Sequence, residues 1–286
     1  MSQIKPPSSA KARDAVSIDS PAEGGGAASR LSSIKINDLS KVRETRWRPG
    51  LADQPRHTEI FASANDASGA GLALALASDA LRMCFINKPP LNETEDRRQI
   101  LWIQDKRAVQ RGGRPYIHGL PAELRDRLIY AEAGTPEDAL FALEEGLKCR
   151  DLACVIGEIA GNPRALDFTA SRRLSLTAEK HGVALWLVRL EAEADLSSAR
   201  MRWRVKSAPS SAPLWNQEAP GAPQWRAELF RARSHVPGQW TLSNDNQRLS
   251  ICQHPRPANT DTAGPPDIGH LVRPTVGRSL AAVARA

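Results

Sequence analysis

Hydrophobic residues in the middle of the chain alternate between short, almost wholly apolar runs and longer periodic segments. The runs predict buried strands, at residues 58–61, 100–104, 128–131, 152–156 and 183–188. Between them lie segments with apolar residues at helical spacing, at residues 72–81, 135–148 and about 165–181. Apolar strands that alternate with such helices predict βαβ units and a mainly parallel sheet flanked by helices, an α/β fold.

The pattern changes after residue 195. Residues 200–206 alternate strictly between basic and apolar side chains, which is typical of a strand with one solvated face. Three more strands are predicted at residues 225–231, 239–242 and 248–251, with Pro-Gly and Asn-rich turns between them. We expect these strands to form a C-terminal antiparallel extension of the parallel sheet.

The two ends of the chain have little to bury. Residues 1–30 are rich in Pro, Gly and Ser, and residues 254–286 hold five prolines. The predicted organisation is a disordered tail at 1–30, an amphipathic helix and linker at 31–56, an α/β domain at 57–253, and a flexible tail at 254–286. The helix is expected to end before Pro49-Gly50 and to be detached from the domain.

Charge is distributed unevenly over the 286 residues. The chain carries 39 Lys and Arg against 32 Asp and Glu, a net charge of +7. Residues 1–56 have a net charge of +4, residues 57–195 of −4, and residues 196–286 of +7. Basic ends around an acidic middle favour contact with nucleic acid or an acidic partner, while solubility alone is the simpler explanation.

Composition also excludes several classes of protein. No apolar run approaches the roughly 18 residues of a membrane span, and the N-terminus lacks the apolar stretch of a secretory signal. The four cysteines show no C-x-x-C spacing, which argues against a zinc module or a disulfide scaffold. We therefore expect a cytoplasmic protein without a membrane contact.

The segment after the first strand has the position of a phosphate-binding loop. Such a loop needs Gly for close backbone approach, Lys for the β- and γ-phosphates, and a hydroxyl for Mg²⁺. Gly69 fits this pattern, but Ala64 replaces the first Gly, Ala70 the Lys, and Gly71 the Ser or Thr. The sequence predicts a degenerate loop with little nucleotide binding.

The acid that would position a metal is expected at the end of the strand at 152–156. Gly157 stands there, and Glu158 follows one residue late. Because a shift of one residue along a strand reverses the side-chain direction, we expect Glu158 to be a displaced and poor substitute. The six histidines show no metal-ligand spacing and no Gly-x-Ser-x-Gly motif occurs, so we predict no catalytic residue, cofactor, metal or small-molecule substrate.

A basic row is predicted on the strand at 200–206. Period-two alternation places Arg200, Arg202, Arg204 and Lys206 on one face, above a core of Met201, Trp203 and Val205. Four like charges on one face favour an anionic partner, either DNA or an acidic protein; a solvated strand edge that discourages aggregation is the alternative. We expect Arg202→Ala/Arg204→Ala to leave folding intact and to weaken such binding.

Several segments together resemble the ImuA family of bacterial accessory proteins of SOS mutagenesis. They are residues 101–105 (LWIQD), 114–120 (RPYIHGL), 144–149 (EEGLKC), 155–159 (VIGEI), 164–173 (RALDFTASRR), 196–205 (LSSARMRWRV) and 225–233 (WRAELFRAR). Each segment alone is weak evidence for the family, but the order and density of the segments together are specific to it. The resemblance covers roughly residues 57–253.

The resemblance implies a RecA-like core, similar also to the SulA division inhibitors. It implies a non-catalytic adaptor in damage-induced translesion DNA synthesis, with an ImuB-like protein, an error-prone C-family DNA polymerase and RecA as partners. It also implies association with the nucleoid when DNA is damaged. Two alternatives remain: a weak RecA-like ATPase or recombination modulator, and a SulA-like division inhibitor.

Overall fold

The computed structural model describes residues 45–50, 54–86, 98–213, 215–216, 218–245 and 248–252. The predicted tails at 1–30 and 254–286 and the predicted helix after residue 31 lie outside these residues. None of the helices within them is both long and apolar enough to cross a membrane.

Strands and helices follow one another much as the hydrophobic pattern predicts. The strands are β1 (Thr45–Arg46), β2 (His57–Ala62), β3 (Gln99–Asp105), β4 (Leu128–Ala133), β5 (Leu152–Ala160), β6 (Ala184–Leu190), β7 (Met201–Ala208), β8 (Gln224–Ala232), β9 (His235–Val236), β10 (Gly238–Asp245) and β11 (Arg248–Ile251). The helices are α2 (Ser68–Ile86), α3 (Lys106–Gly112), α4 (Ala122–Arg125), α5 (Pro136–Lys148) and α6 (Phe168–His181), with a short 3₁₀ turn at Ile117–Gly119.

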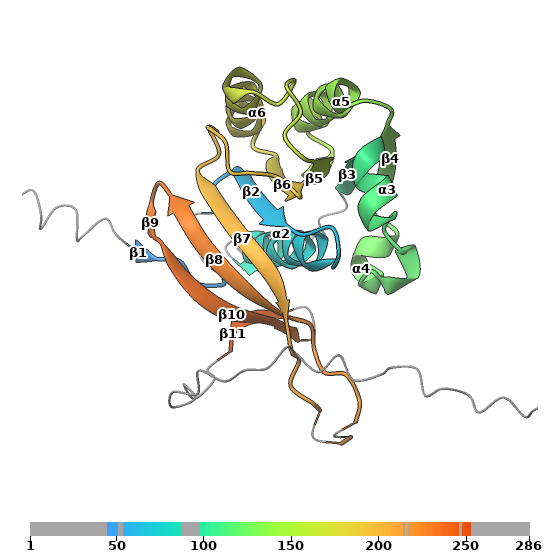
Figure 1. Cartoon of the computed structure of the whole chain (residues 1–286), viewed down its shortest axis with the longest axis vertical. Coiled ribbons are helices and arrows are strands. Elements are labelled where there is room, and N and C mark those ends of the chain that lie inside the picture. Colours follow the sequence, from blue (N-terminus) through green and yellow to red (C-terminus); the bar gives the residue numbers. More distant parts are fainter. Residues whose placement is uncertain are drawn as a thin grey trace, which may run out of the picture. The chain divides into compact units, whose positions relative to one another are not determined.

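Nine strands form one mixed sheet in the order β11-β10-β8-β7-β2-β6-β5-β3-β4. From β7 to β4 all neighbours are parallel, and from β7 to β11 all are antiparallel. Helix α2 covers one face of the parallel part, and α5 and α6 cover the other (Figure 1). The predicted fold class, an α/β sheet with an antiparallel C-terminal extension, is confirmed.

Local sequence explains the helix boundaries. The Thr135 hydroxyl accepts a hydrogen bond from the Asp138 amide (3.1 Å) at the start of α5, with Pro136 in the first turn. The Asp167 carboxylate caps α6 by accepting from the Ala170 amide (2.7 Å). Gly182 ends α6 in the left-handed region, with φ of 73°, where a side chain would be strained.

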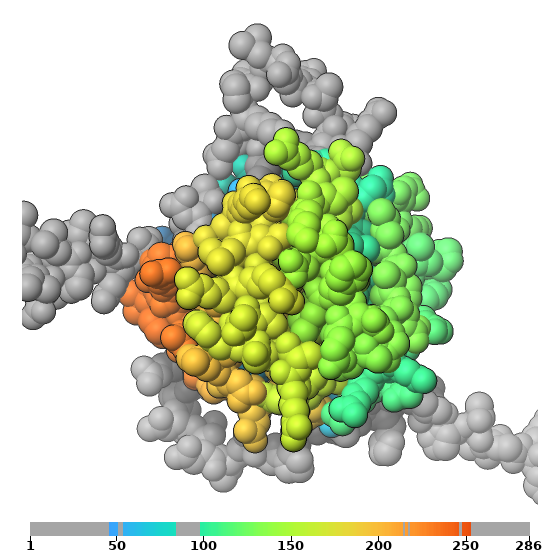
Figure 2. Space-filling view, turned by 90° about the horizontal axis from the view of Figure 1, so that it is seen from above, coloured from blue at the N-terminus to red at the C-terminus, as the bar shows by residue number. Residues whose placement is uncertain are grey.

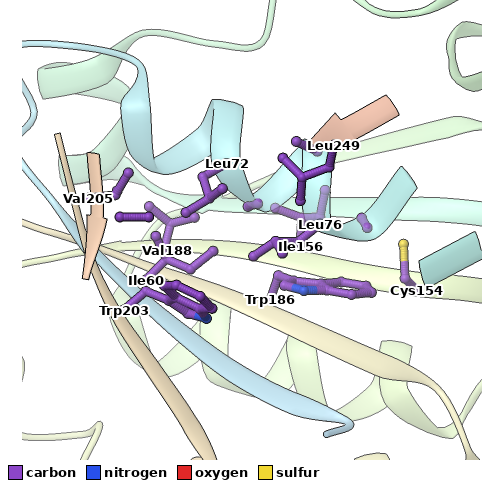
Figure 3. Close-up of a cluster of buried hydrophobic side chains, with 14 of the residues drawn as sticks. Ile60, Leu72, Leu76, Cys154, Ile156, Trp186, Val188, Trp203, Val205 and Leu249 are labelled. Carbon is purple, nitrogen blue, oxygen red and sulfur yellow. The ribbon is translucent and has the colours of Figure 1, made fainter. Parts of the chain in front are cut away.

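The sheet separates two hydrophobic cores. Against α2, apolar side chains such as Leu72 and Leu76 pack on Ile156, Trp186 and Val188 of the strands (Figure 3). Against α5 and α6, the core includes the following residues: Ile103, Leu143, Val155, Ile159, Leu174 and Leu187. Every residue of β5 and β6 is buried because these central strands are covered on both faces.

A segment assigned to the linker from its sequence belongs to the core. Strand β1 pairs with β9, and the next residue, Trp47, is fully buried. Its ring meets those of Trp203 at 4.9 Å and Trp240 at 5.8 Å between centroids, both in edge-to-face geometry. The segment up to Gly50 therefore packs on the antiparallel extension and is not detached from it.

Candidate functional site

The segment with the position of a phosphate loop lies at the carboxyl end of β2, where ligands of α/β sheets bind. Residues 63–67 form the turn, and Gly69, Ala70 and Gly71 fall in the first turn of α2. The structure thus brings Ala64 and these three residues to the predicted place.

Packing accounts for both glycines of this turn. A Cβ on Gly69 would come within 2.8 Å of both Ala62 Cβ and Val188 Cγ1, so the glycine allows α2 to approach the strands. A Cβ on Gly71 would lie 3.1 Å from the ring of Trp225. A hydroxyl side chain at position 71, as Mg²⁺ binding needs, would press on that ring.

Carboxylates accept hydrogen bonds from the backbone amides that would otherwise bind a phosphate. Glu191 Oε1 accepts hydrogen bonds from the Ala64 amide and the Ser63 hydroxyl, both at 2.7 Å. Asp66 Oδ1 accepts from the Ser68 amide (3.0 Å) at the start of α2, and Asp66 Oδ2 from the Ser207 hydroxyl (2.9 Å). Glu191 adopts a positive φ of 50°, and it is the only non-glycine residue with positive φ among the described residues.

Both carboxyls are held in their charged form. Hydrogen bonds from Ser63 and the Ala64 amide lower the pKa of Glu191. Burial opposes ionisation of Asp66, but its hydrogen bonds to Ser68 and Ser207 outweigh burial and lower the pKa of this carboxyl. The loop therefore presents negative charge where a nucleotide would bring more.

The prediction for the acid on β5 needs correction. Strand β5 runs to Ala160, so Gly157 and Glu158 lie within it. Gly157 faces α5, and a Cβ there would lie 2.8 Å from Leu143 Cδ2, so no acid fits. Side-chain alternation turns Glu158 toward α2 and the loop. Glu158 is thus the residue of β5 that faces the candidate site.

Glu158 is buried and partnered. Its Oε1 accepts a hydrogen bond from Trp102 Nε1 at 2.7 Å. Burial raises the pKa of Glu158, and the nearby Asp105 carboxyl raises it further, against hydrogen bonds from Trp102 and Gln104.

A hollow of about 360 Å³ lies between these elements. Ala64, Asp66, Ala70 and Gly71 line it on the loop side, and Gln104 and Glu158 on the strand side. Residues 112–116 close it opposite α2. Within the described ranges, no three His, Cys, Asp or Glu side chains are grouped as metal ligands would be.

The structure divides the predicted basic row. Arg200 precedes β7 and forms an ion pair with Glu179 of α6 at 2.7 Å. Arg202 is only 2% exposed, and its Nε donates to Glu59 Oε2 at 2.7 Å. Arg204 and Lys206 are exposed. The prediction that all four face solvent is wrong for Arg202, which is buried beside Glu59, Phe61 and Phe230, whereas Arg200 is exposed despite its ion pair.

A buried polar network accounts for Arg202. Glu59 Oε1 accepts from the Ser197 hydroxyl (2.7 Å), and Ser197 in turn lies 2.8 Å from the Ser171 hydroxyl of α6. His57 Nδ1 lies 2.7 Å from the Ser175 hydroxyl, and burial lowers the pKa of His57 to about 4. This network was not predicted; its signal in the sequence is Glu59, an acidic residue inside a short apolar strand.

The tryptophans of the strands are core residues, and for Trp203 the alternation along β7 predicts this. Trp186, Trp203, Trp225 and Trp240 are each 8% exposed or less, and Met201 and Val205 are buried beside them. Trp215 differs: it lies in the loop between β7 and β8 and is 80% exposed. The sequence alone had not separated it from the others.

No protein-family model matches this chain. Two curated proteins, both called "Protein ImuA" and from two strains of Caulobacter vibrioides, are 36% identical to it over 134 residues. Over this stretch the chain is similar in sequence to ImuA.

The alignment with ImuA covers 43% of this chain and 52% of the relative. The chain thus spans about half the length of the curated ImuA proteins that it matches. The resemblance to the ImuA family predicted from short segments is confirmed to this extent.

Proposed function

We propose that this protein is an accessory factor of SOS mutagenesis, the mutagenic DNA synthesis that follows DNA damage. The similarity to ImuA carries this proposal, because it is specific in sequence and extends over 134 residues. We place the function in the cytoplasm, at the nucleoid when DNA is damaged.

We further propose that the protein acts as a non-catalytic adaptor. The supporting observation is the Glu191 carboxylate on the Ala64 amide (2.7 Å), where an incoming phosphate would meet a fixed negative charge. Asp66 holds the Ser68 amide at the start of α2 in the same way (3.0 Å), so the helix terminus is already neutralised. Ala70 supplies no cation to offset this repulsion.

The partners that we propose are an ImuB-like protein, an error-prone C-family DNA polymerase and RecA, as the family resemblance implies. An adaptor needs exposed surfaces in place of a catalytic centre. Exposed apolar side chains on separate elements, including Phe141 of α5 (67%) and Leu176 of α6 (54%), offer such surfaces.

One observation favours a weak ATPase as the second candidate. Glu158 faces the hollow beside the loop, as an acid that positions a metal would. Its Oε1 is already bonded to Trp102, so metal binding would need exchange of that hydrogen bond, and the burial that raises the pKa of Glu158 also disfavours the carboxylate that a metal requires.

A genetic experiment tests the accessory role. We expect a strain that lacks the gene to lose UV-induced mutagenesis and to regain it when the gene is supplied on a plasmid. RecA-dependent recombination serves as the control and should stay normal in the deletion strain. Normal mutation frequency after UV in the deletion strain would overturn the proposal.

A binding experiment tests the non-catalytic role. We expect no micromolar affinity for ATP with Mg²⁺ by calorimetry, and no binding by Ala70→Lys, because Glu191 still occupies the loop. The double variant Ala70→Lys/Glu191→Gln lacks that carboxylate. Of the proteins compared, we expect only this double variant to gain affinity for ATP. Micromolar binding by the natural protein would favour the ATPase.

A further inference from the structure

We propose that the open face of β7, β8 and β10, together with Trp215, binds single-stranded nucleic acid. In this proposal the phosphates contact Arg204, Lys206 and Arg226, and a base stacks on Trp215. The inference does not rest on the accessory role in SOS mutagenesis.

This part of the sheet has one covered and one open face. Trp203, Val205 and Ala227 fill the core on one side. On the other side α6 packs over β2 and β6, and the C-terminal strands, orange in Figure 2, lie to one side of the helices. A hollow of about 610 Å³ lies on these strands, lined by residues that include Arg204, Lys206, Arg226, Gln239 and Thr241.

The cations on this face are poorly neutralised. Lys206 and Arg226 are register partners on adjacent antiparallel strands, and like charges in this position repel. In the part of the chain that the structure describes, no carboxylate forms an ion pair with either of them. Arg204 lies 3.4 Å from Glu228 and 4.1 Å over the ring of Phe230. An anion on this face would relieve the repulsion between Lys206 and Arg226.

Trp215 lies beyond the ends of β7 and β8 that carry Lys206 and Arg226. Its loop projects from the sheet (Figure 1) and contains two consecutive turns, closed by the Asn216 amide on the Pro213 carbonyl (3.2 Å) and the Ala219 amide on the Asn216 carbonyl (3.3 Å). The Trp215 ring is 80% exposed and therefore accessible for stacking by a base.

An exposed aromatic ring on the loop that joins two cation-bearing strands favours single strands. The bases of a duplex are already stacked and paired, whereas those of a single strand are free to stack on a protein ring. An acidic protein surface would use the cations and leave Trp215 without a role. Arg204 and Lys206 also line a second hollow, on the β2 side of β7, together with the carboxylates of Asp66, Glu191 and Glu193. Because these carboxylates repel phosphates, the nucleic acid is expected to run over β8 and β10.

Fluorescence polarisation of a labelled oligothymidylate of about 16 nucleotides tests the charges. We expect Lys206→Ala/Arg226→Ala to weaken binding and to make the log–log salt dependence shallower by about 1.4, at about 0.7 per phosphate contact. The matched control is Arg172→Ala/Lys180→Ala on exposed positions of α6, which removes the same charge and should change neither. Melting temperatures confirm that the variants are folded.

Trp215 gives a second and independent readout. The other six tryptophans are each 8% exposed or less, so quenching of the intrinsic fluorescence by the oligonucleotide reports on Trp215. We expect this quenching to disappear in Trp215→Ala, whose affinity should fall about 5- to 100-fold with an unchanged salt slope. Trp215→Phe should retain part of the affinity.

Three results would overturn the proposal. One is the absence of binding at low salt. Another is binding that neither variant weakens. The third is equal competition by duplex DNA or polyglutamate without quenching, which would assign the face to an acidic partner instead. A matching RNA oligonucleotide distinguishes the two kinds of single strand.

Discussion

Arg202 and Arg204 lie on the same face of one strand, and their surroundings give them opposite roles. The Arg202 guanidinium lies 5.0 Å from the ring centroid of Phe61 and 5.4 Å from that of Phe230, and it is hydrogen bonded to Glu59. The Arg204 side chain is about half exposed, at 54%. A buried ion pair is sensitive to the loss of one partner, because the other charge then stays in the interior unpaired.

We therefore expect Arg202→Ala to lower the free energy of unfolding by about 3–5 kcal/mol, measured by urea denaturation. Arg204→Ala, the matched control on the same strand, should change it by less than about 1 kcal/mol. Glu59→Gln/Arg202→Met should recover part of the loss, since neither residue then leaves a buried charge. An Arg202→Ala protein as stable as the natural one would show that the pair is not buried in solution.

His57 makes stability depend on pH. Burial, with a smaller contribution from the charges of Arg202 and Arg189 against that of Glu59, lowers its pKa to about 4 from 6.5. The unfolded state thus takes up the proton first as pH falls. The contribution of His57 is complete above pH 6.5 and decreases by about 1.4 kcal/mol per pH unit down to about pH 4.

The free energy of unfolding of His57→Asn, measured across this range, should lack that decrease. The substitution of the exposed His118 by Asn is the control and should keep it. Parallel curves for the natural protein and His57→Asn would contradict a depressed pKa at this position.

At the scale of elements, burial on both faces distinguishes β5 and β6 from the strand at the edge. Val155 of β5 is fully buried under α5 and α6, whereas Ile129 of the edge strand β4 is 46% exposed. Helix α2 approaches β2 and β6 closely because Gly69, in its first turn, has no side chain to hold the helix away.

The same substitution at two positions tests this difference. Val155→Asp puts a carboxylate without a partner into the interior and should cost several kcal/mol, comparable with the stability of a whole domain. Ile129→Asp should cost less than about 1 kcal/mol, since its side chain reaches water. Thermal denaturation compares the two, and similar melting temperatures would contradict the buried central position of β5.

At the scale of the whole molecule, Trp47 connects distant parts of the chain. It lies before the first strand of the large sheet, and it packs on strands that follow it by more than 150 residues. Its ring lies against Trp203 of β7 and Trp240 of β10. The antiparallel extension is thus held by β2 on one side and by this segment on its covered face.

We expect Trp47→Ala to lower the free energy of unfolding by about 3–5 kcal/mol, as for other large buried aromatic residues. Trp215→Ala is the matched control: it removes an 80% exposed ring and should leave stability nearly unchanged. Near-ultraviolet circular dichroism should also change in Trp47→Ala, since three rings share the cluster. Equal stability of the two variants would place Trp47 outside the core.

The local and periodic features of this protein follow from the sequence of each segment. The alternation of strands and helices, the capping of α5 by Thr135 and the end of α6 at Gly182 depend on neighbouring residues, and all were predictable. The side-chain alternation of β7 also placed Trp203 in the core and the arginines opposite it.

Which of these residues are exposed to water depends on contacts between segments far apart in the sequence. Arg202 became buried because α6 and the residues before β7 cover its half of the strand, and no local pattern encodes that cover. The role of Glu158 depended on the length of β5, and that of Glu191 on a turn 127 residues from Ala64. Contacts between distant segments follow from packing, which the hydrophobic pattern of one segment does not contain.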